Sequence, residues 1–308
     1  MYAPPELTRS RTTRARQLMA RSRTERFAVG AFNADNLETI SAICRAAHRL
    51  AAPVFVELSH AEVEVLGLAN VRDVVDNMID DLGVEVYLNL DHAPTVRDAV
   101  AAIDAGYELI HIDIAQADHQ ATDDDIIAAT REVVTFARRT GALVEGELRY
   151  LAGSSTLHQE PVDMAAVRSS LSTPEGAIAF VDATGIDTFA VGIGNIHGRY
   201  RTSKDLDLDL LARIRAAIDV NISLHGGSGT PEPVYRRLAR GGVGKININS
   251  DARYAYRSTL EQQFATHPDE YATAKLIRPV IDAIQDAVET KIRAFGSAGK
   301  AQPGVHHD

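Results

Sequence analysis

Short apolar segments rich in Val, Ile and Ala recur along this chain, with helical patterns between them. Eight such segments can be counted, and several of the helical stretches that follow them end in Gly, the usual helix stop. The segments are Phe27–Phe32, Val54–Leu58, Val84–Leu90, Leu109–Ile114, Leu143–Leu148, Thr188–Val191, Asn221–Leu224 and Gly244–Ile248. Because strand–helix alternation implies a parallel sheet, eight units in about 250 residues predict a closed (β/α)8 TIM barrel rather than an open sheet.

The remainder of the chain is expected to complete this single α/β domain of residues 1–308. We expect the barrel at about 27–250, C-terminal helices at about 251–296 and a loose tail at 297–308. The Arg-rich residues 9–26 contain the apolar pair Leu18 and Met19 and lead directly into the first strand. This favours an N-terminal capping helix over a basic arm or a transit peptide.

Charge and composition exclude several classes of partner. The formal net charge of -10 and the pI near 5.6 argue against a nucleic-acid-binding surface, which generally shows a basic stripe. No apolar run reaches the length of about 20 residues that a membrane span needs. The one cysteine, Cys44, excludes a disulfide framework and fits a cytoplasmic location.

The strand ends carry an unusual set of polar residues. The third segment ends in Asp91 and His92, and His197 and His225 follow the sixth and seventh. An Asp-His pair at a strand end is by itself more often a turn with a surface imidazole. The carboxyl ends of barrel strands meet at one face, however, so three histidines there predict a catalytic metal site. Asp113 and Glu147 are placed to orient the rings.

Two polar loops predict a phosphate site beside this metal site. HGGSG follows the seventh segment with Gly226, Gly227 and Ser228, and NINSD follows the eighth with Asn247, Asn249 and Ser250. Glycines let backbone N–H groups approach an anion, and the loops after strands 7 and 8 are the customary phosphate site of this barrel.

In combination these motifs resemble the class II, metal-dependent fructose-bisphosphate/tagatose-bisphosphate aldolases over nearly the whole chain. The resemblance rests on FAVGAFNADNLE, LDH, VEGEL, VGIGNIHGRY, LHGGSGTP, KININSD and FGSAGK, which occur in barrel order. It implies a lyase that cleaves and forms a ketose phosphate reversibly, with dihydroxyacetone phosphate as donor and no Schiff-base lysine.

The resemblance also assigns roles to individual residues. It implies Zn²⁺, or another divalent ion, bound by His92, His197 and His225 with Glu147 as the metal's carboxylate, and a monovalent cation as a further candidate. It makes Asp91 the acid that serves the aldehyde oxygen and places Asn247 beside the enediolate. Phosphate and other substrate contacts are expected at Asn33, Ser59, Gly198, Arg201, Gly226, Gly227, Ser228, Asn247, Asn249 and Ser250.

Two departures from the family pattern concern the rest of the substrate. The loop after the fifth strand reads ELRYLAGSSTLHQEP, with Ser155 where the family has its proton-transferring Glu, so Glu160 becomes the candidate base and His158 a second one. Near the C-terminal helix, Ala274 replaces the Arg that takes the aldehyde-side phosphate, and Arg278 is the candidate substitute. We therefore expect an aldehyde partner other than glyceraldehyde 3-phosphate.

Two other functions stay open on the sequence alone. One is a degenerate aldolase-like protein that binds sugar phosphates without catalysis. The other is a metal-dependent hydrolase on the same barrel, although GAFNADN lacks the His-x-His that such enzymes generally need at the first strand. The family resemblance further implies a homodimer or homotetramer.

Overall fold

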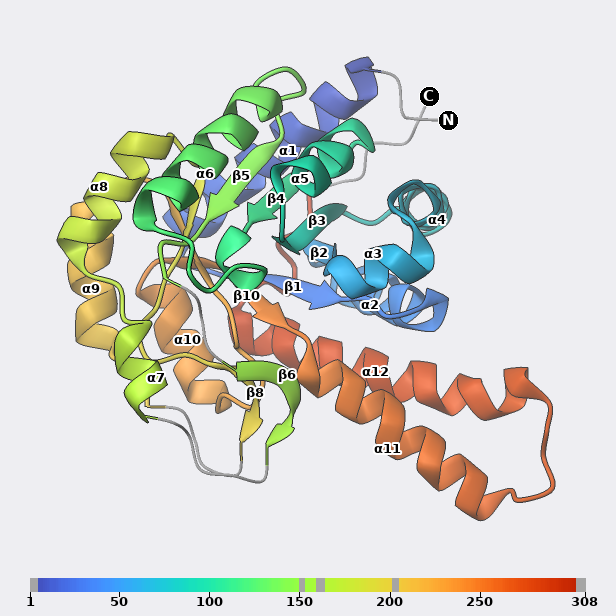
Figure 1. Ribbon diagram of the computed structural model, residues 1–308. Helices are drawn as coiled ribbons and strands as arrows, with labels where there is room; N and C mark the ends of the chain where they lie inside the picture. The colour runs from blue at the N-terminus through green and yellow to red at the C-terminus, as the bar shows by residue number, and fades with distance from the viewer. Residues whose placement is uncertain (1–4, 150–152, 159–163, 201–204, 303–308) are drawn as a thin grey trace.

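Eight parallel strands close into a barrel in the order β1-β10-β9-β7-β5-β4-β3-β2 (Figure 1). The computed structural model describes residues 5–149, 153–158, 164–200 and 205–302. The barrel strands are β1 Val29–Asn33, β2 Val54–Leu58, β3 Val86–Ala93, β4 Leu109–Ile112, β5 Leu143–Gly146, β7 Thr188–Ala190, β9 Asn221–Leu224 and β10 Val243–Ile248. The predicted (β/α)8 barrel is confirmed, and each predicted strand overlaps an observed one.

Helices cover the outside of the barrel. They are α1 Pro5–Glu25, α2 Leu37–Leu50, α3 His60–Leu66, α4 Leu68–Leu82, α5 Val96–Asp104, α6 Asp123–Ala137, α7 Met164–Ser169, α8 Pro174–Thr184, α9 Leu208–Ala217, α10 Glu232–Arg240, α11 Ser250–Thr266 and α12 Thr273–Phe295, with a 3-10 turn at Ile114–Gln116. None of the helices in the described ranges is both long and apolar enough to cross a bilayer.

A small second sheet stands outside the barrel. Strands β6 (Gly153–His158) and β8 (His197–Tyr200) pair in parallel. The sequence analysis did not predict it, because the residues Gly153, Ser154 and Ser155 lack the apolar character of a strand. His197 therefore begins a strand of its own beyond β7.

The expected N-terminal capping helix is α1, and it closes the amino end of the barrel. Its apolar residues Ala15, Leu18 and Met19 belong to one buried cluster with residues near the starts of five strands. Those strand residues are Val29, Ala31, Phe55, Tyr87, Leu109 and Leu143. The bottom of the barrel is thus apolar and sealed.

Above this apolar layer the barrel interior becomes charged. Side chains two residues further along each strand point to the same side, which places Glu57, Asn89, His111, Glu145, Ser223 and Lys245 in a middle layer. All six are 0 % exposed. Contacts across the barrel join them: Asn89 Nδ2 donates to Glu57 at 3.0 Å, and Lys245 Nζ lies 3.1 Å from a Glu145 oxygen. Side chains two residues further along each strand lie at the carboxyl-end face of the barrel.

The C-terminal helices form an arm. Figure 1 shows α11 and α12 side by side, extending away from the barrel. Residues 297–302, expected to belong to a loose tail, are instead attached to the barrel. The N–H groups of Gly299 and Ala301 donate to the carbonyls of Leu50 and Ala51, and Ser297 is fully buried. Residues 303–308 lie outside the described ranges.

Candidate active site

The site begins with an irregularity in β3. The pairing of β3 with β4 shifts register between Leu90 and Ala93, and His92 between them has a φ of +50°. Consecutive residues in a regular strand point to opposite faces, but a bulge re-aims them. Asp91 and His92 therefore both line one cavity at the carboxyl end of the barrel. The left-handed backbone at His92 is strain of the kind that functional sites carry.

The cavity encloses about 290 Å³. Among the described residues it is lined by Asn33, Ser59, Asp91, His92, Gln116, His197, Gly198, His225, Gly226, Ser228, Asn247, Asn249, Ser250 and Arg253. Twelve of these fourteen were candidates from the sequence, and the structure brings them together; Gln116 and Arg253 are additions.

His92 is oriented by Asp113. Its Nδ1 lies 2.7 Å from Asp113 Oδ2, so Nε2 faces the cavity. Burial alone would lower the pKa of His92, but Asp91, Asp113 and Glu147 together raise it to about 10. The pKa of Asp113 is lowered in spite of its burial, because His92 donates to it. This pairing is the predicted carboxylate support of a metal-binding imidazole.

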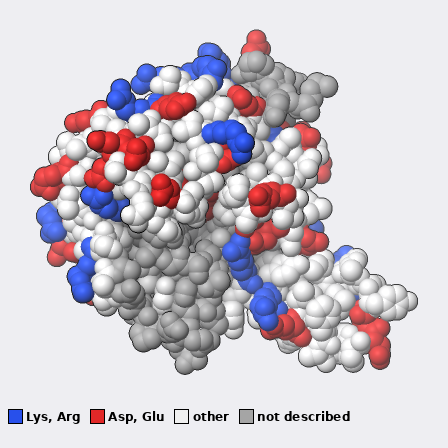
Figure 2. Space-filling view, in the orientation of Figure 1, with Lys and Arg blue, Asp and Glu red and all other residues white. Residues whose placement is uncertain are grey.

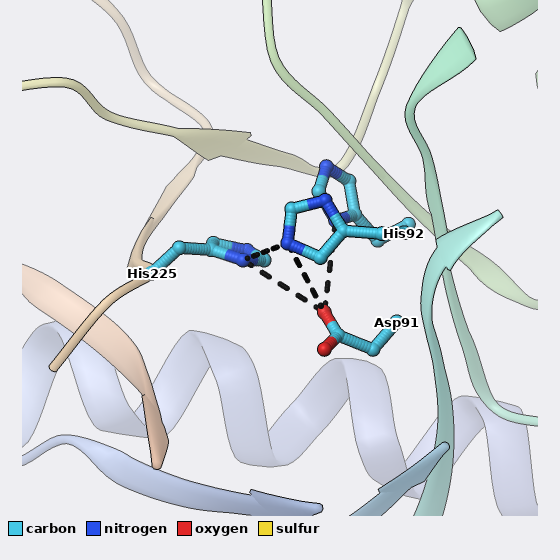
Figure 3. Close-up of side chains that lie close together, drawn as sticks. Asp91, His92 and His225 are labelled. Carbon is cyan, nitrogen blue, oxygen red and sulfur yellow. Dashed lines mark hydrogen bonds and ion pairs between the residues drawn. The ribbon is translucent and has the colours of Figure 1, made fainter. Parts of the chain in front are cut away.

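His225 is oriented from the layer below. Its Nε2 lies 2.5 Å from Glu145 Oε1, and Nδ1 faces His92 Nε2 at 3.0 Å (Figure 3). Burial and the neighbouring His111 lower the pKa of His225 to about 4, so this ring is neutral at pH 7. The lone pair of Nδ1 therefore points at the place where His92 presents its Nε2–H.

The charge balance of this region favours a bound cation. Five carboxyl groups are buried in and beneath the cavity, namely Glu57, Asp91, Asp113, Glu145 and Glu147. The fully buried Lys245 contacts two of them, Glu57 and Glu145, and His92 contacts two others, Asp91 and Asp113. Burial and neighbouring acids raise the pKa values of Glu57 and Glu147 well above their ordinary values. Convergent imidazole nitrogens with such an acidic surrounding fit a divalent metal ion.

The two other predicted metal ligands are less closely grouped. The His197 ring lies 5.0 Å from that of His92 and 6.2 Å from that of His225, between centroids. Glu147 forms a potential ligand group with His92 and Asp113, and its Oε1 has no hydrogen-bond partner among the described residues. His225 instead groups with Asp91, His92 and His111.

Two amides hold Asp91. Asn33 Nδ2 donates to one carboxylate oxygen and Asn247 Nδ2 to the other, each at 3.2 Å. Burial would raise the pKa of Asp91, but His92, His111, His225 and Lys245 lower it well below its ordinary value. Asp91 is therefore an ionised carboxylate whose position is fixed on both sides. The Oδ1 of Asn247 is buried and lacks a partner in the described part of the chain.

The predicted phosphate loops meet at one end of the cavity. Gly226 has a φ of +62°, and a Cβ there would lie 2.3 Å from the Ile196 carbonyl oxygen, so only Gly fits. The N-terminus of α11 begins beside it at Ser250, and helix N-termini attract anions. Gly227, a predicted substrate contact, does not line the cavity. Its N–H donates to the Asn247 carbonyl, which joins the two loops.

Arg253 also lines the cavity, one turn of α11 beyond Ser250, and its charge is already paired. Its guanidinium donates to Asp35 Oδ1 at 2.7 Å and also contacts Glu62. Glu62 in turn accepts from the backbone and hydroxyl of Ser59. Arg278 is exposed on α12 and does not line the cavity. Arg201 and Glu160 lie outside the described residues, and His158 falls on β6 with its side chain outside the description.

His111 and Lys245 are among the buried titratable residues that the sequence analysis did not single out. Both lie two residues before a predicted site residue, Asp113 or Asn247, on the same strand. Residues two positions apart on a strand point to the same face, so an inspection of the residues two positions before each strand end would have found them.

Comparison with known proteins gives a consistent result. The family model described as fructose-bisphosphate aldolase class-II matches residues 13–300. A fructose-bisphosphate aldolase of Streptococcus pyogenes is 35% identical, over 93% of this chain and 98% of its own. The 6-phospho-5-dehydro-2-deoxy-D-gluconate aldolase of Bacillus subtilis is 32% identical, over 93% and 96%. The crystal structure of the YdjI aldolase from Escherichia coli K12 superposes with a TM-score of 0.79 at 26% identity, covering 94% and 98%.

Proposed function

The chain belongs to the class II fructose-bisphosphate aldolase family and is therefore a lyase, and on this premise we propose that it cleaves a ketose phosphate to dihydroxyacetone phosphate and an aldehyde. The observation that carries the proposal is the convergence of His92 Nε2 and His225 Nδ1, 3.0 Å apart beside Asp91. The family uses a divalent metal, and we propose zinc held by His92, His197 and His225 with Glu147 nearby.

Bound there, the ion would supply Lewis-acid stabilisation of negative charge on the donor oxygens. The chain's own residues do the rest. Asp91, ionised and held by two amides, accepts the proton of the substrate hydroxyl whose carbon becomes the aldehyde, and returns it in the condensation direction. Asn247 Oδ1 is available to a donor hydroxyl, and the N-terminus of α11 with Gly226 and Ser228 binds the donor phosphate.

The first prediction is metal-dependent proton exchange on the donor. The protein should exchange a carbon-bound hydrogen of dihydroxyacetone phosphate with D2O, which NMR follows without any aldehyde present. A chelator should reduce the rate about a hundredfold or more, and added Zn²⁺ should restore it. Glu160→Ala should slow exchange because Glu160 is the proposed proton carrier, and His158→Ala is the matched comparison.

A fully zinc-loaded protein that binds dihydroxyacetone phosphate but exchanges no proton would contradict the catalytic proposal. That outcome would favour the sugar-phosphate-binding alternative. If exchange is retained in Glu160→Ala and lost in His158→Ala, His158 replaces Glu160 as the proton carrier.

The aldehyde partner is proposed to lack a phosphate. A phosphorylated aldehyde needs an unneutralised cation in the cavity besides the groups that bind the donor phosphate. Among the described lining residues Arg253 is the guanidinium, but Asp35 and Glu62 bring two negative charges to its one positive charge. Arg278 is on an exposed part of α12, and Ala274 offers no charge. These contacts support a neutral, hydroxyl-bearing aldehyde.

The second prediction tests this charge pairing. The double variant Asp35→Asn/Glu62→Gln should free the Arg253 guanidinium, while the amide oxygen introduced on α3 can still accept from Ser59 and keep the helix capped. We expect the ratio of kcat/KM for glyceraldehyde 3-phosphate over that for glyceraldehyde to rise about tenfold, measured in the condensation direction. The control is Glu261→Gln, which removes a carboxylate from an exposed ion pair with Arg257 on the same helix α11. An unchanged ratio in the double variant would count against the proposed neutral aldehyde.

We further propose that the protein is a cytoplasmic homodimer or homotetramer. On the α11–α12 arm, Phe264 is 53% exposed and Tyr271 is 91% exposed, which favours an apolar contact between copies.

The proposed cytoplasmic location fits the state of the one cysteine. Cys44 is buried and the pKa of its thiol is raised to about 12, which fits a thiol kept reduced. Over the described part of the face in Figure 2, acidic and basic side chains are interspersed.

A further inference from the structure

Three polar side chains lie behind the glycine loop of the predicted phosphate site. They belong to Tyr235 on α10, Asp251 in the first turn of α11 and Lys291 on α12. None of the three lines the cavity, and the proposed reaction uses none of them. The Lys291 and Asp251 side chains are only 15% and 12% exposed. Withdrawing two charges from water is costly, so the contacts that they make need an explanation.

Lys291 contacts two residues that hold the loop at two different points. Its Nζ lies 2.7 Å from Asp251 Oδ2 and donates to the Tyr235 hydroxyl at 3.1 Å. The Tyr235 hydroxyl donates in turn to the Gly227 carbonyl at 2.7 Å. The Asp251 carboxylate accepts from the Gly229 N–H at 3.2 Å. A chain of hydrogen bonds therefore runs from Gly227 through the three side chains to Gly229, with one loop residue between the two glycines.

The residue between them is Ser228, which lines the cavity. Its Oγ accepts from the backbone N–H groups of Asn249 and Asp251, at 3.3 and 3.4 Å. Gly229 has a φ of +77°, so the chain turns sharply as it leaves the loop. These contacts fix the place of Ser228 relative to the N-terminus of α11, and both are proposed to bind the donor phosphate.

The charge on Lys291 has a second effect. Asp251 directly follows Ser250, which lines the phosphate end of the cavity, and a carboxylate near a bound phosphate repels it. Burial alone would lower the pKa of Lys291, but Tyr235 and Asp251 raise it, so Lys291 is a cation at pH 7. Burial raises the pKa of Tyr235, so its hydroxyl keeps the proton that it donates. Lys291 therefore offsets the negative charge of Asp251.

We propose that Lys291 is a positioning residue for the donor phosphate. It holds the loop 226–229 through Tyr235 and Asp251, and it neutralises the Asp251 carboxylate beside the phosphate. This inference rests on the proposed function, in which the loop binds the phosphate of dihydroxyacetone phosphate. Because Lys291 does not line the cavity, its removal should weaken binding of the donor and leave the proton transfer unchanged.

Proton exchange on dihydroxyacetone phosphate, followed by NMR in D2O with the zinc-loaded protein, separates affinity from chemistry. Lys291→Met should raise the half-saturating concentration at least about tenfold, the loss expected for contacts made by a charged group. The maximal exchange rate should stay within about twofold of the wild type. Adding Asp251→Asn should recover most of the affinity, because the amide oxygen still accepts from the Gly229 N–H and carries no charge.

Lys300→Met is the matched control. Lys300 Nζ also forms an ion pair at 2.7 Å, with Glu25, and lies 5.6 Å from the centre of the Phe27 ring. Lys291 Nζ lies 4.9 Å from the centre of the Tyr235 ring. Lys300 makes its contacts at the amino end of the barrel, so Lys300→Met should bind the donor like the wild type. Circular dichroism verifies that each variant is folded.

Two results would overturn the role of Lys291. One is a half-saturating concentration in Lys291→Met within about twofold of the wild type. The other is a maximal rate that falls as far as the affinity, because that marks a general loss of structure. An affinity that Asp251→Asn fails to recover would refute the neutralisation of Asp251.

Calorimetric binding of inorganic phosphate by the same proteins keeps this inference apart from the proposed function. A wild-type protein that exchanges no proton contradicts the proposed function. Equal phosphate affinity in the wild type and in Lys291→Met contradicts the role of Lys291, whatever the exchange rate.

Discussion

Replacing Asp91 by Asn is expected to lower kcat for carbon–carbon bond cleavage by about 10³-fold, within the usual range for loss of a general acid–base group. Proton exchange on dihydroxyacetone phosphate should fall by less than about tenfold, because Asp91 serves the aldehyde-side hydroxyl and another group serves the donor. The fold should tolerate the change, since the Asn247 amide can turn its unpaired Oδ1 toward the new NH2 group. Cleavage is measured from ketose phosphate and exchange by NMR on the same preparations.

Asp113→Asn is the matched control for Asp91→Asn. It removes a carboxylate of the same size that also contacts His92, but at the ring nitrogen facing away from the cavity. We expect metal affinity to fall about 10–100-fold, with activity largely restored by excess Zn²⁺. An Asp91→Asn enzyme that still cleaves within tenfold of the wild-type rate would rule out Asp91 as the proton-transfer group.

The second large effect concerns stability. Lys245→Met should reduce the free energy of unfolding by about 3–5 kcal/mol at pH 7, because it leaves the buried carboxylate of Glu145 without its cation. Lys245 Nζ lies 3.1 Å from Glu145 and 3.8 Å from Glu57, and all three side chains are 0 % exposed. Urea unfolding of the metal-free proteins measures the difference. The double variant Lys245→Met/Glu145→Gln should recover part of the loss, since it removes one unpaired charge.

The stability lost in Lys245→Met should depend on pH, and the pKa of Glu145 gives the direction. Burial would raise the pKa of Glu145, but Lys245 and His225 lower it below its ordinary value. The Glu145 pairing therefore stabilises the folded state above the unfolded pKa of about 4.3 and is lost as pH falls through the lower folded pKa. Without Lys245 the pKa of Glu145 rises, so the stability gap between wild type and variant should narrow as pH falls below about 5. A gap of less than about 1 kcal/mol at pH 7 would be incompatible with this account.

The sequence predicts the barrel well because hydrophobic periodicity is a local property. It also predicts that polar strand ends meet, which brings His92, His197 and His225 to one face. It does not predict the bulge in β3, because the φ of His92 depends on how β3 pairs with β4. Before the bulge is known, Asp91 and His92 are expected to point to opposite faces.

The ion pairs of Arg253 could not be predicted from the sequence either. Asp35 follows β1, Glu62 lies on α3 and Arg253 lies on α11, so only the closed barrel brings the three together. His111 is different, since its spacing from Asp113 was visible in LIHID. It was missed because only strand-end residues were considered.

Different helices, strands and loops supply the two groups of side chains that line the cavity. The groups facing the proposed ion come from β3, β8 and the loop after β9, whereas the Arg253 contacts come from α11, α3 and the loop after β1. Under the proposed function, substitutions at Asp35, Glu62 and Arg253 would therefore change the charge that the cavity presents to an aldehyde and leave the imidazoles in place. In an evolving lineage or a directed library, we expect acceptor preference to diverge at these three positions while the bond-breaking chemistry persists.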